Sequence, residues 1–329
     1  YSSSKAWNLV TGEGGTTTEG ARTVRFRVRD RALNVSATVD DSIIYDATAP
    51  TSGAWYVNAG NPTYTNSAVV NIVAATAPAD SGSGIAQIRF SNNGGAAWSA
   101  WEAYGTPKAW DLQTGAGGSA TQGTRAVTVQ VMDGAGRTSA TTSDSIVYDY
   151  SAPSPGAWQI SGTTVYTNAA SHTVAKATDP GDAYSGIASQ CFSNDNATWT
   201  AWEGYTGSKT SWNLTSGYGG TTAQGTKYVY VKVRDGAGNE SAATSDSIVY
   251  DTVAPTVDAV TNTYSGSSQS YLKSGTYTFT AAVTNTGTGT IAPVADVKFY
   301  RDSASTGTTT LVATDTVAAY TWAWDTSAT

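Results

Sequence analysis

The stretch VYVKVRDGAGNESAATSDSIVYDTVAP, residues 229–255, contains the pattern that decides the fold. It begins with alternating apolar and polar residues, turns at a glycine-containing segment, continues as a second run of the same kind and ends at a proline. Alternation with a period of two is typical of a half-buried β-strand, and glycine between two such runs is typical of a hairpin. The stretch therefore predicts two antiparallel strands followed by an exit from the domain.

The same pattern occurs twice more, as VTVQVMDGAGRTSATTSDSIVYDYSAP at residues 127–153 and as VRFRVRDRALNVSATVDDSIIYDATAP at residues 24–50. Corresponding residues are 103 and then 102 positions apart, as the series Trp7, Trp110 and Trp212 illustrates. A fixed period of this kind is the signature of an array of similar units. We therefore expect the function to lie in the array and at its junctions rather than in a single pocket.

The period divides the chain into two complete domains, residues 49–150 and 151–252, and two partial ones. Residues 1–48 correspond to the C-terminal half of a domain, and residues 253–329 form a divergent domain that is incomplete at its C-terminus. In the first complete domain we expect strands at residues 54–57, 69–75, 85–91, 97–104, 108–112, 127–132 and 145–149. In the partial domains we expect strands at residues 5–9, 23–29, 276–282 and 297–301. About seven short strands per hundred residues, without helical periodicity, is the pattern of an all-β antiparallel sandwich.

Composition limits the classes of function. Charged residues make up 13% of the 329 residues and the net charge is −7, which disfavours nucleic acid and anionic membranes as partners. No apolar run approaches the roughly 18 residues of a membrane-spanning segment. The single cysteine, Cys191, excludes an intramolecular disulfide framework. The chain starts at Tyr1 without a recognisable signal peptide, as expected for a mature or excised segment of an extracellular protein.

Four segments carry a resemblance to a known class of repeat. They are SGIAQIRFSNNGGAAWSAWEAY (83–104), KAWDL (108–112), VQVMDGAGRTSATTSDSIVYDYSAPS (129–154) and the pair VKFYRD (297–302) with LVATDTVAAYTWAWDT (311–326). Together they resemble the tandem bacterial immunoglobulin-like repeats of large secreted or cell-surface proteins, most strongly over residues 1–256. The resemblance implies immunoglobulin-like sandwiches in an elongated rod, serving as a non-enzymatic part of an extracellular fibre or adhesin stalk. Carbohydrate-binding or spacer modules of a secreted polysaccharide-acting protein are the alternative.

Aspartates recur where one domain is followed by the next. In a sandwich whose chain enters and leaves at opposite ends, the exit of one domain lies near the loops after the second and sixth strands of the next. We therefore expect two groups, Asp46 with Asp80 and Asp133, and Asp149 with Asp179, Asp182 and Asp235. Such carboxylates repel one another unless a cation neutralises them, and Ca²⁺ takes six to eight oxygen ligands. The resemblance also implies Ca²⁺ at domain junctions. Aspartates that only begin tight turns are the alternative.

The last junction departs from this pattern, because residues 284–293 contain no carboxylate to join Asp251.

Tryptophan pairs are the second candidate constellation, Trp98 with Trp101 and Trp199 with Trp202. Exposed tryptophan stacks on sugars, so cell-surface glycans are a candidate partner. Each pair follows a turn, at residues 91–98 or 193–199, that resembles the Asp-box hairpin of sialidases, which implies that tryptophan packs beneath the turn. Structural tryptophan is the favoured interpretation.

No catalytic constellation is recognisable. The sole histidine, His172, has no partners for a zinc site or a triad and is expected to be a surface imidazole. Cys191 is expected to be an exposed thiol rather than a nucleophile, and the paired carboxylates of a glycosidase are not evident. We therefore predict a protein that is not an enzyme. Glycosylation sequons begin at Asn34, Asn196, Asn213 and Asn239.

The two partial domains are complementary. Residues 253–329 of one copy and residues 1–48 of a second copy contain the halves of one sandwich, so copies are candidates for head-to-tail joining. A longer repetitive polypeptide, in which neighbouring repeats supply the missing halves, is the favoured alternative. Either way, the partners are other copies or neighbouring repeats of the same protein.

Overall fold

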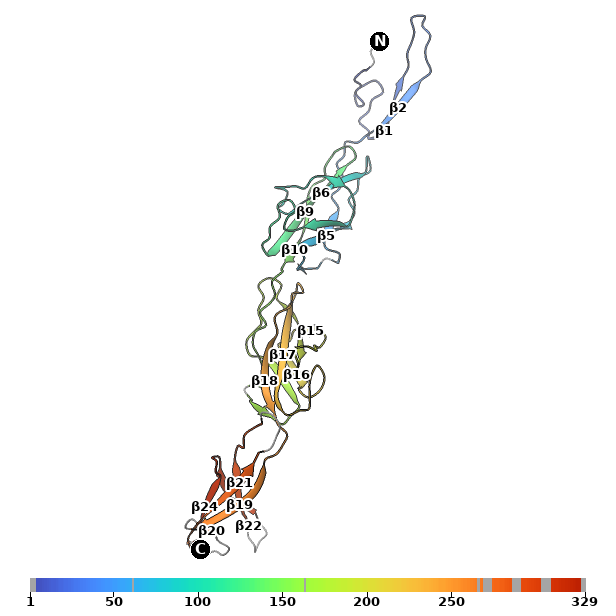
Figure 1. Cartoon of the computed structure of the whole chain (residues 1–329). Helices are drawn as coiled ribbons and strands as arrows, with labels where there is room; N and C mark the ends of the chain where they lie inside the picture. The colour runs from blue at the N-terminus through green and yellow to red at the C-terminus, as the bar shows by residue number, and fades with distance from the viewer. Residues whose placement is uncertain are drawn as a thin grey trace. The chain divides into compact units, whose positions relative to one another are not determined.

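The structure is a computed structural model that describes residues 4–60, 62–162, 164–264, 267–268, 274–285, 291–302 and 309–326 (Figure 1). Every regular element in these ranges is a β-strand, which confirms the predicted all-β class. The chain forms two compact units. The first contains Tyr1–Ala152, Asp182–Gly186 and Asp235–Asn239, and the second contains Pro153–Gly181, Ile187–Arg234 and Glu240–Thr329. The described part of the chain contains no helix with the length and apolarity of a membrane span.

Residues 54–148 form a sandwich of two sheets. The first sheet has the order β3-β5-β8 and consists of β3 (Ala54–Val57), β5 (Val69–Thr76) and β8 (Lys108–Asp111). The second has the order β4-β10-β9-β6-β7 and consists of β4 (Tyr64–Thr65), β6 (Ile85–Ser91), β7 (Glu102–Ala103), β9 (Gly123–Asp133) and β10 (Thr142–Tyr148). The pairs are antiparallel except for β4 with β10.

Strand β9 shows why the sequence pattern leads to this core. Its residues Val127, Val129 and Val131 are at most 1% exposed and pack with Trp55, Ile72 and Phe90 from the facing and neighbouring strands. Branched apolar side chains at every second position bury one face of a strand against the opposite sheet. The alternation in the sequence thus marks the face of β9 that is buried. The expected strand at residues 97–104 is wrong for most of its length, because only Glu102–Ala103 pair with β6.

Residues 158–250 repeat this topology strand for strand. One sheet has the order β11-β13-β16, with β11 (Trp158–Ile160), β13 (Ser171–Lys176) and β16 (Ser208–Asn213). The other has the order β12-β18-β17-β14-β15, with β12 (Tyr166–Thr167), β14 (Ile187–Ser193), β15 (Glu203–Gly204), β17 (Gly225–Asp235) and β18 (Thr244–Tyr250). The sequence repeat is therefore a repeat of structure.

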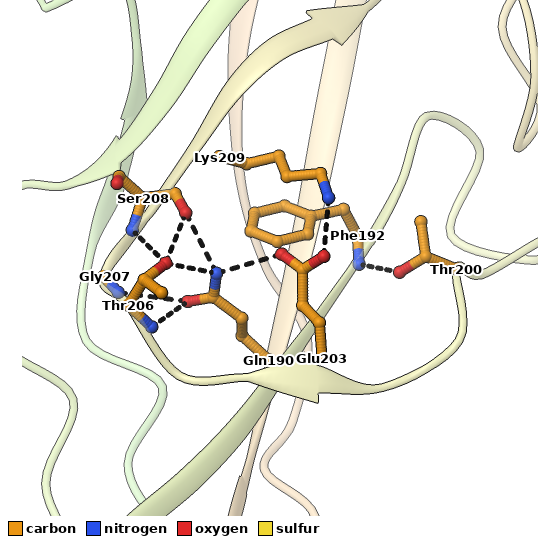
Figure 2. A network of polar contacts seen from close by, with 8 residues as sticks. All are labelled: Gln190, Phe192, Thr200, Glu203, Thr206, Gly207, Ser208 and Lys209. Carbon is orange, nitrogen blue, oxygen red and sulfur yellow. Dashed lines mark hydrogen bonds and ion pairs between the residues drawn. The ribbon is translucent and has the colours of Figure 1, made fainter.

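One core position differs in kind between the two sandwiches. Ile88 on β6 and Gln190 on β14 occupy corresponding places, and both are 0% exposed. Figure 2 shows that the Gln190 amide is surrounded by polar partners. Its Nε2 donates to Glu203 Oε1 (3.2 Å), Thr206 Oγ1 (3.0 Å) and Ser208 O (3.0 Å), and its Oε1 accepts from the amides of Thr206 (3.3 Å) and Gly207 (3.1 Å). A buried amide with all of these bonds costs little, whereas an unpaired one is destabilising.

Residues 4–48 contain one hairpin, β1 (Gly20–Phe26) paired with β2 (Val39–Tyr45). The expected strand at residues 5–9 is wrong: this segment has no partner strand here, whereas β8 is held by β5. The apolar face of the hairpin was expected to be half-buried, but Phe26 is 56% exposed and nearby Val28 is 59% exposed. The described residues of this half-domain include no second sheet to cover them.

The C-terminal part contains two sheets. One has the order β20-β19-β21-β24, with β19 (Thr256–Tyr264), β20 (Ser267–Ser268), β21 (Thr276–Thr284) and β24 (Thr321–Asp325). The other pairs β22 (Val297–Asp302) with β23 (Thr309–Asp315). Strand β24 pairs with β21 as β16 pairs with β13. Residues 322–325 therefore take the place of the strand around Trp212.

Candidate functional site: two acidic clusters

The first acidic cluster consists of Asp46, Asp80 and Asp133. Asp46 follows β2, Asp80 lies in the loop after β5, and Asp133 is the last residue of β9. One carboxylate oxygen from each lies within 4.8 Å of the others. Asp46 and Asp133 are buried, and Asp80 is half-buried. The structure thus brings together the three residues that the sequence grouped.

A serine hydroxyl links this cluster to the following hairpin. Ser83 donates to Asp46 Oδ2 through its backbone N (2.8 Å) and its Oγ (2.5 Å), and these bonds, the hydroxyl first, lower the pKa of Asp46. The same Oγ accepts from the backbone N of Ala135 (3.0 Å). Ser83 was not anticipated from the sequence, although Ser-Gly-Ile recurs at residues 83–85 and 185–187.

The remaining carboxylates also begin turns. Asp80 Oδ2 accepts from the backbone N of Gly82 (3.1 Å) and of Gly84 (2.6 Å). Asp133 Oδ1 accepts from the backbone N of Ala135 (2.9 Å) and of Arg137 (2.9 Å). In contrast, Asp133 Oδ2 is buried without a hydrogen-bond partner among the described residues. A buried carboxylate oxygen in this state is destabilising unless a positive or donor group reaches it.

The second cluster consists of Asp149, Asp182 and Asp235, again with one oxygen from each within 4.8 Å of the others. All three belong to the first compact unit. Ser185 takes the part of Ser83: its Oγ donates to Asp149 Oδ2 (2.5 Å) and accepts from the backbone N of Ala237 (3.2 Å). Asp182 Oδ2 accepts from three backbone N–H groups at 2.8–3.0 Å, those of Tyr184, Ser185 and Gly186.

The hairpins of the two clusters differ at two adjacent positions, Arg137 against Asn239 and Thr138 against Glu240. The first of these positions contacts the aspartates. Arg137 donates through Nε to the backbone O of Asp46 (3.2 Å). Asn239 donates through Nδ2 to the equivalent backbone O, that of Asp149 (3.0 Å), and also to Asp235 Oδ2 (2.8 Å). The hairpin carboxylate is therefore fully hydrogen-bonded in the second cluster only.

Asp179 does not join the second cluster, so that part of the prediction is wrong. Its carboxylate forms an exposed ion pair with Lys176, a bond that raises the pKa of the lysine. At the last junction, Asp251 Oδ2 accepts from the backbone N of Ala292 (3.0 Å). Residues 286–290, part of the loop for which no carboxylate was expected, lie outside the described residues.

The tryptophan pairs are stacked on cationic side chains of the same sandwich. Arg89 lies over both Trp98 and Trp101, its Cζ 4.4 Å from each ring centroid. In the second sandwich, Lys232 Nζ lies 4.8 Å from the Trp199 ring and Arg234 Cζ lies 4.2 Å from the Trp202 ring. Each of these cation–π contacts covers one face of a tryptophan ring, and that face is closed to a stacking sugar.

The Asp-box-like turns are structural elements. Asp195 accepts from the backbone N of Ala197 (2.8 Å) and of Thr198 (2.7 Å), and these bonds lower its pKa strongly. The neighbouring Asn194 accepts from Trp212 Nε1 (2.8 Å). In the first sandwich Asn93 takes the place of Asp195 and accepts from the backbone N of Ala97 (2.8 Å). The turn therefore does not depend on a negative charge.

Two expectations about single residues are wrong. Cys191 is 2% exposed rather than on the surface, and this burial raises the pKa of its thiol to about 11. His172 is 9% exposed; its Nδ1 lies 2.7 Å from Ser161 Oγ and its Nε2 lies 2.9 Å from the backbone O of Ala169. Strand alternation failed for Cys191 because stacked side chains cover the outer face of this sheet.

The fold is that of tandem immunoglobulin-like β-sandwiches. No protein-family model matches the sequence, and no curated protein matches it. Among solved structures, the chain is similar to the fibronectin(III)-like modules of CbhA from Clostridium thermocellum, at 14% identity over 59% of this chain and 90% of that one, with a TM-score of 0.34. It is similar to a tetra-tandem repeat in the extending region of a large adhesion protein, at 20% identity over 94% and 74%, with a TM-score of 0.29. It is also similar to the FN1–FN3 domains of chicken CNTN1, at 11% identity over 69% and 77%, with a TM-score of 0.36.

Proposed function

We propose that the chain is a non-enzymatic structural repeat region of an extracellular or cell-surface fibre or adhesin stalk. The observation that carries this proposal is the strand-for-strand repetition of one sandwich, with short proline-containing segments such as residues 149–153 between the repeats. Proline fixes φ and leaves little slack in a linker, so the repeats stack into a stiff rod in which each contacts its neighbours. Small-angle X-ray scattering of the full chain tests this: a rod gives a cross-sectional scattering regime, and a compact or freely jointed particle contradicts it.

A divalent cation, Ca²⁺ by its preference for carboxylate oxygens, stiffens this rod at the acidic clusters. The support is the convergence of three carboxylates in each cluster. A cation that binds only the folded chain at a concentration of about 100 times its Kd raises the free energy of unfolding by about 2.7 kcal/mol. Thermal unfolding of the full chain with Ca²⁺ and with chelator measures this difference.

The matched variant for this experiment is Asp80→Asn with Asp182→Asn. It removes one charge from each cluster, while the amide oxygen still accepts the backbone bonds of the turn. We expect the Ca²⁺-dependent shift to fall in this variant and to persist in Asp251→Asn, whose aspartate belongs to neither cluster. Identical unfolding with Ca²⁺ and with chelator would leave these aspartates as turn residues.

Carbohydrate binding is the alternative function, and the stacked cations argue against it at the tryptophan pairs. Arg89 covers one face of Trp98 and one face of Trp101, so a sugar on these faces would have to displace a guanidinium that also donates to Gln130 Oε1 (2.6 Å). Titration with soluble cell-surface and plant polysaccharides, followed by tryptophan fluorescence, distinguishes the two functions. Quenching in the native chain would favour a binding module.

Copies of the chain join head to tail in the finer form of the proposal. Strand β22 pairs only with β23 among the described residues, whereas its counterpart β6 pairs with both β7 and β9. The exposed counterpart of β9 is β1, beside an open hollow of about 700 Å³ lined by Trp7, Leu9, Phe26 and Ile43. Pairing β1 of a second copy with β22 reproduces the β6–β9 contact that the complete sandwich already contains.

Light scattering of the full chain tests the joining. Head-to-tail joining predicts a mass that grows with concentration, and Phe26→Asp with Val28→Asp is expected to reduce it, because two charges then lie on the surface to be buried. A native chain that stays monomeric would instead favour neighbouring repeats of a longer polypeptide as the occupant.

A further inference from the structure

We propose that the first acidic cluster binds a divalent cation more tightly than the second. Among the described residues, no group donates a hydrogen bond to Oδ2 of Asp133, which leaves this oxygen available to a cation. Asn239 donates one to the equivalent oxygen of Asp235. This inference rests on the proposed cation-stiffened repeat and specifies which of its clusters binds the cation more tightly.

The clusters share a framework of three aspartates and one serine. Their hairpins differ at two positions, Arg137 against Asn239 and Thr138 against Glu240, and Glu240 forms an ion pair with Arg234. Each has an aspartate after the exit strand, one in the loop after β5 or β13, and one at the end of the long strand β9 or β17. Each has a serine hydroxyl 2.5 Å from the exit aspartate. In each, Oδ1 of the hairpin aspartate accepts from the backbone N four residues later, at 2.9 Å in the first cluster and 2.8 Å in the second.

The difference lies in the second oxygen of the hairpin aspartate. Asp235 Oδ2 accepts from Asn239 Nδ2 at 2.8 Å, so a cation there has to compete with an amide donor. Asp133 Oδ2 is buried in a residue that is only 2% exposed, and no described group donates to it. Because Oδ1 already serves the turn, Oδ2 is the Asp133 oxygen that remains for a ligand.

The positive charge of Arg137 is expected to weaken cation binding at the first cluster, but by less than the unbonded Asp133 oxygen strengthens it. Arg137 Nε donates to the backbone O of Asp46 (3.2 Å) rather than to a carboxylate oxygen. The side chain is exposed, and a solvated charge is screened by water and salt. The missing hydrogen-bond donor at Asp133 Oδ2 therefore affects the cation affinity more than the nearby guanidinium does.

The oxygen-only donor set selects the ligand class. Carboxylate oxygens favour hard cations such as Ca²⁺ and Mg²⁺ over metals that prefer nitrogen or sulfur. Three converging carboxylates, one with an open buried oxygen, supply part of a coordination shell that water completes.

Calorimetric titration of the metal-free full chain with Ca²⁺ tests the inference, using reciprocal swaps that each place a residue found naturally in the other cluster. The native chain is expected to show one tighter site and one site weaker by about tenfold, the scale of one competing hydrogen bond. Arg137→Asn is expected to weaken the tighter site by about tenfold, and Asn239→Arg is expected to strengthen the weaker one.

Comparison of Arg137→Ala with Arg137→Asn separates the effect of the lost positive charge from that of the added amide donor. Both Arg137→Ala and Arg137→Asn remove the positive charge, which by itself raises cation affinity, but only asparagine supplies the closing amide. The inference requires affinity to fall with asparagine and to be unchanged or higher with alanine. Two equal sites in the native chain, or the same response to both substitutions, would overturn it while leaving the cation-stiffened repeat intact. Absence of Ca²⁺ binding in every variant would mean that water donates the hydrogen bond to Asp133 Oδ2. It would overturn both the unequal binding and the proposed cation-stiffened repeat.

Discussion

Asp144 Oδ2 accepts a hydrogen bond from the backbone N of Val57 at 2.8 Å, although the two residues belong to different sheets of the same sandwich. The second sandwich repeats the contact between Asp246 Oδ2 and the backbone N of Ile160, also at 2.8 Å. In both cases the donor belongs to a residue that is at most 1% exposed. A side chain therefore satisfies an edge-strand amide that neither sheet ladder reaches.

Replacing Asp144 with alanine is expected to destabilise the first sandwich by about 1.5–3 kcal/mol, the usual worth of a hydrogen bond to a charged group. Asp144→Asn keeps an acceptor and should lose less. Hydrogen exchange at the Val57 amide in the full chain reports the local opening. Equal protection in native chain and alanine variant would show that the bond contributes nothing.

Gly219→Ala is expected to cost more than Gly217→Ala. Both glycines have positive φ, +84° and +67°, where an L-residue pays roughly 1–2 kcal/mol. A Cβ on Gly219 would also collide with the Asp195 side chain, whereas one on Gly217 would meet nothing within 4 Å. Urea unfolding of both variants measures the difference, which isolates the packing of the Asp-box-like turn. Equal midpoints would show that Asp195 yields.

The turn at Asp195 is expected to weaken in acid. Backbone bonds from Thr198 and Ala197 lower the pKa of Asp195 in the folded state. A carboxylate with a lowered folded pKa contributes stability above its unfolded value of about 4, and that stability is lost as pH falls through the folded pKa. Thermal unfolding from pH 6 downward should therefore decline less steeply in Asp195→Asn.

The matching first-sandwich residue, Asn93, is already neutral and forms the same backbone bond, so the variant is expected to fold. Parallel pH profiles for native chain and variant would exclude Asp195 as a source of the acid sensitivity.

Cys191 is expected to resist thiol reagents until the sandwich opens. With a pKa of about 11, about one thiol in a thousand is ionised at pH 8, and the side chain is 2% exposed. The rate of labelling should therefore rise with urea in step with unfolding. Fast labelling in the native chain, at the rate of a small free thiol, would contradict the buried position.

Strand positions were predictable because they depend on local alternation, which Val127, Val129 and Val131 display openly. The convergence of Asp46, Asp80 and Asp133 was predictable because the repeat fixes which loops share one end of a sandwich. Contacts that depend on single side chains were not. Cys191 stands at an outward strand position and yet is buried, since Lys232 and Arg234 stack on tryptophans over that face. Sequence periodicity carries no information about such coverage.

The same limit explains Asp179 and Arg137. Asp179 pairs with Lys176, three residues earlier, a local contact that a count of acidic residues ignores. The contrast between Arg137 and Asn239 was visible in the aligned repeats, but its meaning depends on which donor reaches the second carboxylate oxygen, and only coordinates decide that.

Gln190, the buried glutamine of the second sandwich, affects how neighbouring repeats fold as separate domains. Adjacent domains with similar sequences risk exchanging strands during folding. If β6 entered the second sandwich, Ile88 would leave the amides of Thr206 and Gly207 without the acceptor that Gln190 provides; if β14 entered the first, an amide side chain would be buried in an apolar layer. Either exchange would bury polar groups without hydrogen-bond partners and away from water. One buried polar side chain thus makes the exchange of these strands between the two sandwiches unfavourable.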